Sequence, residues 1–234
     1  MPKTDPEFHS GHRSRLKQKL LDGKLTGYEL LELLLTYAIP RRDVRPLAHS
    51  LVKKFGSVYS VLHASFDELI SVSGIGHGAA TIIKLANELI SVSYKERAEA
   101  GTYLADDKFI RDYCRNLVAG KPVEEFHVLY LGNDRRLLFD EIHSHGTINQ
   151  SAVYPREISR KALQLNAISV ILVHNHPLSE NNFSSEDTAI TSVIEACLNS
   201  FSISLIDHFL VTSNGIVHSL RASPWLNKSS FKSI

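Results

Sequence analysis

The short apolar run Ile168–Val173 is the feature that most constrains how this chain folds. A strand with one solvent-exposed face alternates apolar and polar residues, whereas this run, ISVILV, is apolar almost throughout. Such a run is typical of a strand that is buried on both faces of a sheet. The chain around it carries strand and helix patterns in the order β-β-α-β-α-β-β. We therefore expect a mixed α/β domain of about five strands, with helices covering this strand.

Two predicted hairpins and two amphipathic segments surround this strand. One hairpin turns at Gly132–Asp134, and the other turns at Asn214–Gly215. Residues 154–166 and 184–200 carry apolar side chains at helical spacing, which predicts two helices. Together these elements place the mixed-sheet domain at residues 107–226.

The first hundred residues follow a different pattern. Apolar side chains recur there at helical spacing, and predicted helices end at Gly23 and Gly56. Residues 1–100 therefore predict a helical domain, which a linker near residues 97–107 separates from the mixed-sheet domain.

A glycine turn, Gly74-Ile75-Gly76, joins two predicted helices and resembles a helix-hairpin-helix motif. Its glycines permit a turn too tight for a Cβ, which leaves backbone N–H groups to bind phosphate oxygens. Residues 1–97 carry 14 Lys and Arg against 10 Asp and Glu, a balance of +4, and the remainder carries −3. Gly74, Gly76 and Lys84 are therefore candidate contacts for non-specific DNA binding. A hairpin used only for packing or for protein contacts would have the same pattern.

Composition is that of an ordinary globular protein, with 43% hydrophobic and 22% charged residues. No apolar run reaches the roughly 18 to 20 residues that span a bilayer, and the polar N-terminus lacks a signal-peptide core. These features predict a cytoplasmic protein with no membrane partner. Cys114 and Cys197 lie far apart without a C-x-x-C pattern, so we expect both to be reduced.

A pair of histidines, His174 and His176, follows the apolar run and is stopped by Pro177. Side chains alternate along a strand with period two, so both imidazoles are expected on the same face. Asp187 comes eleven residues after His176, on the first turn of a predicted helix. Two imidazoles and a carboxylate with an open fourth position form the ligand set of a catalytic zinc ion. The sequence thus predicts a metal site at the end of this strand.

Structural roles that need no metal are also open to these residues. Ser184 to Asp187 spell S-S-E-D, a pattern in which Ser184 caps a helix and Asp187 lies near its positive end. A second H-x-H, at His143 and His145, lacks the proline and the following S-x-x-D. His208 follows Asp207 in an apolar strand, either as part of a buried hydrogen-bonded pair or as a residue that orients a ligand.

The residues HNHPLSENNFSSED, 174–187, match the pattern H-x-H-x7-S-x2-D and resemble the signature of JAMM (JAB1/MPN+) metalloproteases. From about residue 10 to 222, the chain is similar to the RadC-like branch of that fold. The resemblance implies a JAB/MPN, cytidine-deaminase-like domain holding one Zn²⁺ through His174, His176 and Asp187. It also implies hydrolysis of peptide or isopeptide-type amide bonds in a protein or peptide substrate, with Ser184 donating to the oxyanion. The branch usually continues HNHPSG, whereas this chain reads HNHPLS.

The resemblance further implies a glutamate some 45 to 55 residues upstream that takes the proton of the attacking water. Glu125 opens a predicted strand and lies 49 residues before His174, which makes it the candidate general base. Glu124, Glu141 and Glu157 are alternatives, and a solvated surface role for Glu125 is a further one.

Two other classes of function compete with hydrolysis of amides. The RadC-like family carries the label of DNA repair, which implies a DNA-processing factor, either a nuclease or a non-catalytic DNA binder. The contiguous letters HNH do not indicate an HNH nuclease, whose three residues are dispersed over a ββα unit. A degenerate scaffold for protein contacts is disfavoured because the predicted ligand set is intact.

Overall fold

The computed structural model describes residues 6–145, 153–177 and 182–221. The chain divides into two compact units, residues 1–89 and residues 90–234. Within the described ranges, no helix combines the length and the apolar character needed to cross a membrane. The domain limits predicted from the sequence, 1–100 and 107–226, differ from the limits of these units and stay a prediction.

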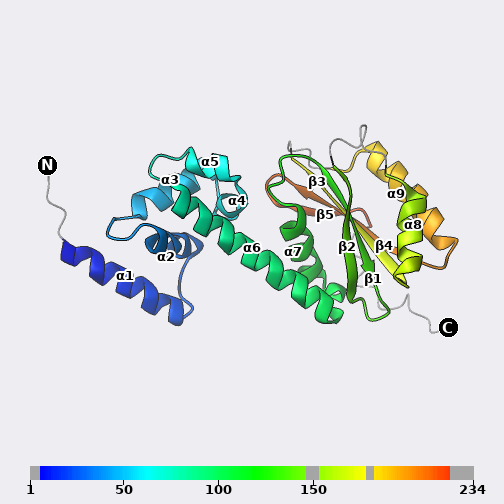
Figure 1. The fold of residues 1–234 in the computed structure, drawn as a ribbon, viewed down its shortest axis with the longest axis horizontal. Helices are drawn as coiled ribbons and strands as arrows, with labels where there is room; N and C mark the ends of the chain where they lie inside the picture. The colour runs from blue at the N-terminus through cyan, green and yellow to red at the C-terminus, as the bar shows by residue number, and fades with distance from the viewer. Residues whose placement is uncertain (1–5, 146–152, 178–181, 222–234) are drawn as a thin grey trace. The chain divides into compact units, whose positions relative to one another are not determined.

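The first unit is helical, as the sequence predicted, and appears in blue to cyan in Figure 1. Its helices are α1 (Pro6–Leu21), α2 (Gly27–Ala38), α3 (Arg45–Phe55), α4 (Val58–His63), α5 (Phe66–Ile70) and the first part of α6 (His77–Ala100). Thr26 begins α2 with a capping box, and Gly56 ends α3 with a left-handed φ of 88°. Buried leucines of these helices, among them Leu35, Leu51 and Leu69, form one core.

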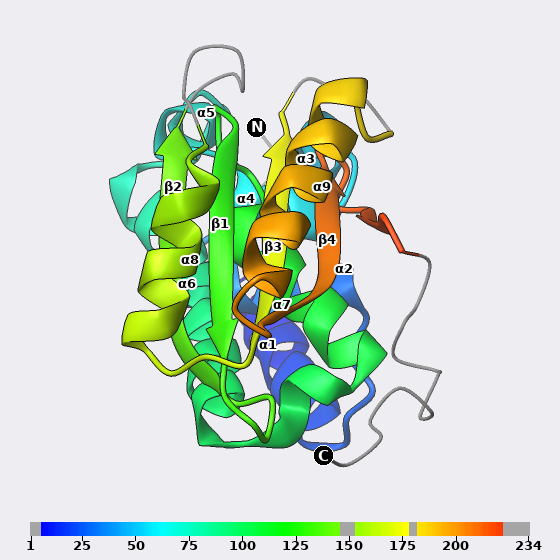
Figure 2. The ribbon, with the colours of Figure 1, turned by 90° about the vertical axis from the view of Figure 1, so that its right-hand side faces the viewer.

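The second unit contains a five-stranded sheet and helices on both of its faces. Its elements are the end of α6, the 3-10 helix η1 (Thr102–Ala105), α7 (Asp107–Val118), β1 (Glu125–Leu131), β2 (Leu137–His145), α8 (Pro155–Gln164), β3 (Ser169–His176), α9 (Ser185–Asn199), β4 (Ser204–Thr212) and β5 (Val217–Ser219). The strand order is β2-β1-β3-β4-β5, with β3 and β4 parallel and the other pairs antiparallel (Figure 2). This arrangement confirms the predicted mixed α/β fold and both hairpins.

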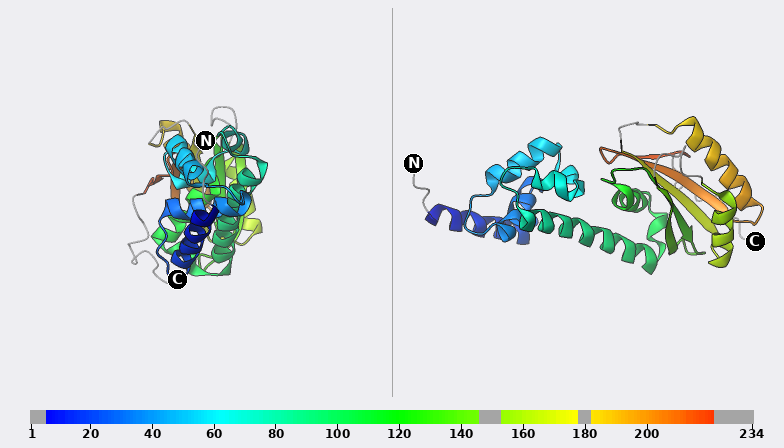
Figure 3. Two further views of the ribbon diagram at one scale, coloured as in Figure 1. Left: turned by 90° about the vertical axis from the view of Figure 1, so that its left-hand side faces the viewer. Right: turned by 45° about the horizontal axis from the view of Figure 1, so that its top comes forward.

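The central strand β3 is buried along its whole length, as its apolar pattern predicted. Ile171 and Val173 pack with α7 on one face, whereas Val170 and Leu172 pack with α8 and α9 on the other. Figure 3 shows the sheet between these two helical layers. Side chains of β3 therefore alternate between two separate cores, and the same alternation continues to the end of the strand.

Helix α7 is an element that we did not predict from the sequence. Phe109, Ile110, Tyr113 and Cys114 lie buried on one side of it, and Asp106 caps its first turn. This helix forms the layer that covers the sheet on the side away from α8 and α9. Much of the linker expected near residues 97–107 is likewise structured, because α6 continues to Ala100 and η1 follows it.

Candidate metal centre

The end of β3 places His174 and His176 on the α9 face of the sheet. Both follow Leu172 at period two, and the two residues are 1% and 5% exposed. Asn175 points to the opposite face, where its Oδ1 accepts a hydrogen bond from Glu125 N at 2.8 Å. Its Nδ2 donates to the carbonyl oxygen of Val123 at 3.1 Å. Asn175 thus ties the start of β1 to the end of β3, which holds the two histidines in register.

Asp187 enters the same space from the first turn of α9. Ser184 caps this helix in a complete capping box, so the cap that S-S-E-D predicts is confirmed and coexists with the convergence of the three residues. The N–H and the hydroxyl of Ser184 both donate to Asp187 Oδ2, at 2.8 and 2.7 Å. The other oxygen, Oδ1, is buried and accepts no hydrogen bond from any residue in the described ranges. The cap therefore fixes the carboxylate with one oxygen available as a ligand.

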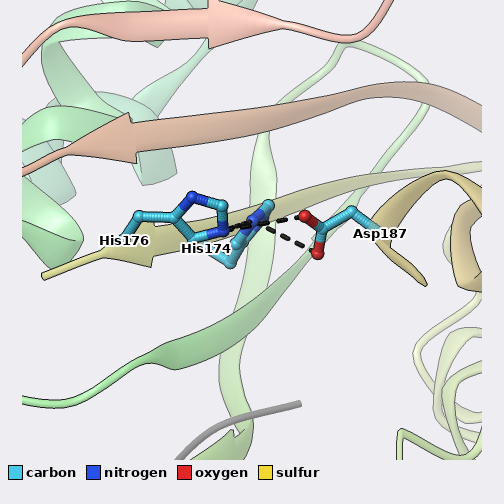
Figure 4. Close-up of side chains that lie close together, drawn as sticks. All are labelled: His174, His176 and Asp187. Carbon is cyan, nitrogen blue, oxygen red and sulfur yellow. Dashed lines mark hydrogen bonds and ion pairs between the residues drawn. The ribbon is translucent and has the colours of Figure 1, made fainter. Parts of the chain in front are cut away.

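The three candidate ligands converge on one point, with their ligand atoms within 4.8 Å of one another (Figure 4). His174 Nε2 lies 3.1 Å from His176 Nε2 and 3.4 Å from Asp187 Oδ1. His176 Nε2 lies 3.6 Å from Asp187 Oδ2. Ligand atoms at zinc-like bond lengths around a tetrahedral ion are separated by roughly 3.3 Å. Both the spacing and the nitrogen and oxygen donors fit a zinc ion.

Burial and pairing act in opposite directions on this cluster. Burial alone would raise the pKa of Asp187, but the close approach of His174 and His176 outweighs burial and holds that pKa far below its usual value. Asp187 is therefore a carboxylate at neutral pH and ready to bind a cation.

His208 on β4 lies directly behind His174 and is fully buried, which lowers its pKa well below the usual value. Its Nε2 is 2.8 Å from His174 Nδ1, and its Nδ1 is 2.6 Å from Thr191 Oγ1 on α9. The neighbouring Asp207 instead contacts Ser219 and the backbone N–H of His208. Asp207 and His208 thus form the buried hydrogen-bonded pair that the sequence allowed, and His208 also contacts a candidate ligand, as the second role requires.

Glu125, the expected general base, lies on the other face of the sheet. It is separated by two positions from His127, and its Oε2 is 2.9 Å from His127 Nε2. Its Oε1 is 3.6 Å from Lys121 Nζ. Its carboxylate therefore does not join the three-residue cluster, and its role as a base stays a prediction.

The remaining predicted residues are placed as follows. Gly74 has φ +92°, and a Cβ there would touch side chains, whereas a Cβ on Gly76 would meet nothing within 4 Å. The ammonium of Lys84 donates to the carbonyl oxygen of Ala64 at 3.0 Å, which is a packing contact within the helical unit. The ring of His143 accepts a hydrogen bond from the backbone of Tyr154. The departure from HNHPSG, at positions 178 and 179, lies outside the described residues.

Sequence reasoning missed four residues around the site. Asn175 was given no role, Thr191 was not singled out, and the aromatic rings of Phe126 and Phe183 were not connected with the histidines. The centroids of these two rings lie 6.2 and 5.7 Å from that of His174. A polar Thr191 on the apolar side of a predicted helix was the one available signal.

Comparisons with known proteins place this site in a wider group. Residues 104–225 match the RadC-like JAB domain family. A UPF0758 protein of Fusobacterium nucleatum is 38% identical over 216 residues, which cover 88% of this chain and 93% of that protein. A UPF0758 protein of Ruegeria pomeroyi is 35% identical over 224 residues, which cover 94% of this chain and 100% of that protein. The three convergent residues lie inside the matched domain.

Proposed function

This chain belongs to the RadC-like JAB domain family, and on that premise we propose that it is a zinc-dependent JAMM-type hydrolase of peptide or isopeptide-type amide bonds. JAB domains form a superfamily of the metallohydrolase type. The observation that carries the proposal is the convergence of His174, His176 and Asp187, with a carboxylate oxygen that accepts no hydrogen bond from the described residues. A buried group of this kind is costly unless a ligand binds it.

His174, His176 and Asp187 would hold one Zn²⁺ and leave its fourth position to solvent or substrate. The bound ion would supply Lewis-acid chemistry, lowering the pKa of a water and polarising the scissile carbonyl. The task left to the chain is to take a proton from the attacking water and to return it to the leaving amine. That task requires a carboxylate on the same face of the sheet as the ligands.

We assign this proton transfer to Glu124 rather than to Glu125. Phe126 is the register partner of His174 on the neighbouring strand and packs on the α9 face. If the period-two alternation of β1 extends one residue before its start at Glu125, Glu124 is on the face of Phe126, whereas Glu125 shares the opposite face with His127. In this proposal Glu124 leaves the backbone toward the ligands, at the end of the sheet where β3 ends.

Ser184 acts on Asp187 in this proposal. Its single hydroxyl proton is directed to Asp187 Oδ2, so the hydroxyl orients a ligand. Donation to an oxyanion, the role implied by the resemblance, would require the hydroxyl to turn away from Asp187. That role stays a prediction.

The test uses the purified full chain, its zinc content and its hydrolysis of peptide and isopeptide substrates. We expect one zinc ion per chain and hydrolysis that chelators abolish and added zinc restores. Asp187→Ala should lose both zinc and activity. His127→Ala is the matched control, because it removes a buried imidazole from the other face of the same sheet. Folded, zinc-free protein with undiminished hydrolysis would overturn the proposal.

The helical unit supports a second candidate function, non-specific DNA binding. The turn at Gly74 and the open backbone at Gly76 lead directly into α6, which begins at His77. The first N–H groups of a helix lack partners within the helix and bind phosphate well. We propose that this turn contacts the DNA backbone; Lys84, the third predicted contact, bonds to the carbonyl oxygen of Ala64 at the end of α4.

Binding of a labelled duplex, measured by fluorescence anisotropy, tests this second function. Gly76→Glu places a negative charge at the turn and should weaken binding about tenfold or more at low salt. Gly11→Glu adds the same charge at another open glycine and should change binding much less. Equal effects of the two variants would reject the turn as the contact. Plasmid cleavage that His176→Ala abolishes would favour the alternative, a DNA-processing nuclease.

A further inference from the structure

We infer that Thr191 and His208 set the tautomer of His174, so that its Nε2 presents a lone pair to the metal. The inference rests on the metal-binding part of the proposed function. It concerns two residues outside the candidate ligand set, which are therefore positioning residues. The evidence is a chain of three hydrogen bonds that runs from the backbone of α9 to the ring of His174.

The first link fixes the proton of the Thr191 hydroxyl. Thr191 Oγ1 lies 2.5 Å from the carbonyl oxygen of Asp187, and a carbonyl oxygen carries no proton. The hydroxyl must therefore donate to this carbonyl. Its only proton is then used, so the hydroxyl can be only an acceptor toward His208 Nδ1, which lies 2.6 Å away. His208 consequently carries a proton on Nδ1.

The second link passes this constraint to His174. His208 is fully buried, and burial favours the neutral form of an imidazole. A neutral imidazole with a proton on Nδ1 has an acceptor at Nε2. That acceptor lies 2.8 Å from His174 Nδ1, so His174 donates from Nδ1. In neutral His174 the remaining nitrogen, Nε2, is then bare.

The bare nitrogen is the one that faces the other candidate ligands. His174 Nε2 lies 3.1 Å from His176 Nε2 and 3.4 Å from Asp187 Oδ1. Two aromatic rings flank His174 and His208. The ring centroids of Phe126 and Phe183 lie 5.5 and 5.2 Å from that of His208. These apolar side chains offer no hydrogen-bond acceptor to either imidazole.

Removing the Thr191 hydroxyl should switch the tautomers of both His208 and His174. Without its acceptor, the Nδ1 proton of His208 moves to Nε2, where it can donate to His174 Nδ1. His174 then carries its own proton on Nε2, and that proton must be lost before a metal binds. Thr191→Val makes this change in a side chain of nearly the same shape, and Thr191→Ser restores the hydroxyl.

The experiment uses the full chain and zinc alone. Nitrogen-15 NMR of the metal-free protein reports the tautomer of each histidine, and competition with a chromophoric chelator reports zinc affinity. We expect a proton on Nδ1 of His174 in the wild type and in Thr191→Ser. Thr191→Val should show the proton on Nε2 and bind zinc about 10- to 100-fold more weakly. Thr188→Val is the matched control, because Thr188 makes the same hydroxyl-to-carbonyl bond on the exposed side of α9.

Two results would overturn the inference: a bare Nδ1 on His174 in the wild type, or unchanged zinc affinity in folded Thr191→Val. The wild-type tautomer decides the matter alone should Thr191→Val fail to fold. Neither readout involves a substrate, so an absence of hydrolysis would reject the proposed activity while leaving this inference standing.

Discussion

Both faces of the sheet at the end of β3 bury polar side chains, but the hydrogen-bond partners of these side chains differ between the two faces. On the α7 face, Glu125 pairs with His127. The Oδ1 and the Nδ2 of Asn175 each form a hydrogen bond with a backbone group. On the α9 face, His174 and Asp187 converge with His176, and one carboxylate oxygen accepts no hydrogen bond from the part of the chain that the structure describes.

This difference separates a structural polar cluster from a candidate binding site. Buried polar groups that are paired within the chain hold strands in register at little net cost. Asp187 Oδ1 accepts no hydrogen bond from the described residues, and the nearby imidazole nitrogens could bind a cation together with it. The α9 face therefore carries the proposed function, and the α7 face keeps the strand ends in place.

The sharpest test of this contrast removes the carboxylate charge from one of two neighbouring residues, Glu124 or Glu125. Glu124→Gln should lower the rate of hydrolysis about 10²- to 10⁴-fold while zinc stays bound, because general-base catalysis is lost. Glu125→Gln should lower the rate far less, since its carboxylate serves His127 on the other face. Steady-state kinetics with zinc analysis measures both variants. The reverse order of effects would assign the base to Glu125.

Zinc should stabilise the fold through the α9 face only. At free zinc about 100 times the Kd, binding adds about 2.7 kcal/mol to the free energy of unfolding. This increase should be present in His127→Ala and absent in Asp187→Ala, as measured by urea unfolding with and without zinc. A similar increase in Asp187→Ala would show that zinc binds elsewhere.

Asn175→Ala tests the α7 face directly. The substitution leaves the Glu125 N–H and the Val123 carbonyl without their partner, and we expect a loss of about 1 to 3 kcal/mol in unfolding free energy. Zinc stoichiometry should not change, because Asn175 points away from the ligands. Urea unfolding of the metal-free variant gives the first quantity and metal analysis the second. An unaltered stability would contradict the structural role.

Ser184→Ala should have the smallest effect. Loss of the helix cap costs about 1 kcal/mol, and Ser184→Thr should retain most of that stability. Zinc affinity should fall in Ser184→Ala, because the hydroxyl bond that holds Asp187 Oδ2 is removed. Thermal unfolding and chelator competition report the two effects. Unchanged zinc affinity would show that the backbone N–H of Ser184 alone is enough to orient Asp187.

Features that depend on neighbouring residues in the chain were predictable from the sequence. Alternation along β3 put His174 and His176 on one face, and the spacing from Ser184 to Asp187 predicted the helix cap. Helix α7 had the same kind of signal, since Phe109, Ile110 and Tyr113 recur at helical spacing. This helix was therefore predictable, although we did not predict it.

The sequence by itself determined which residues share a face of a strand or a turn of a helix, because backbone geometry imposes those periods locally. Only the tertiary structure decided that His208, 34 residues from His174, lies against it, and that Thr191 completes the chain of bonds. It also showed which face of the sheet Glu125 occupies. These contacts depend on strand register and on the packing of α9 against β4, which no local period specifies.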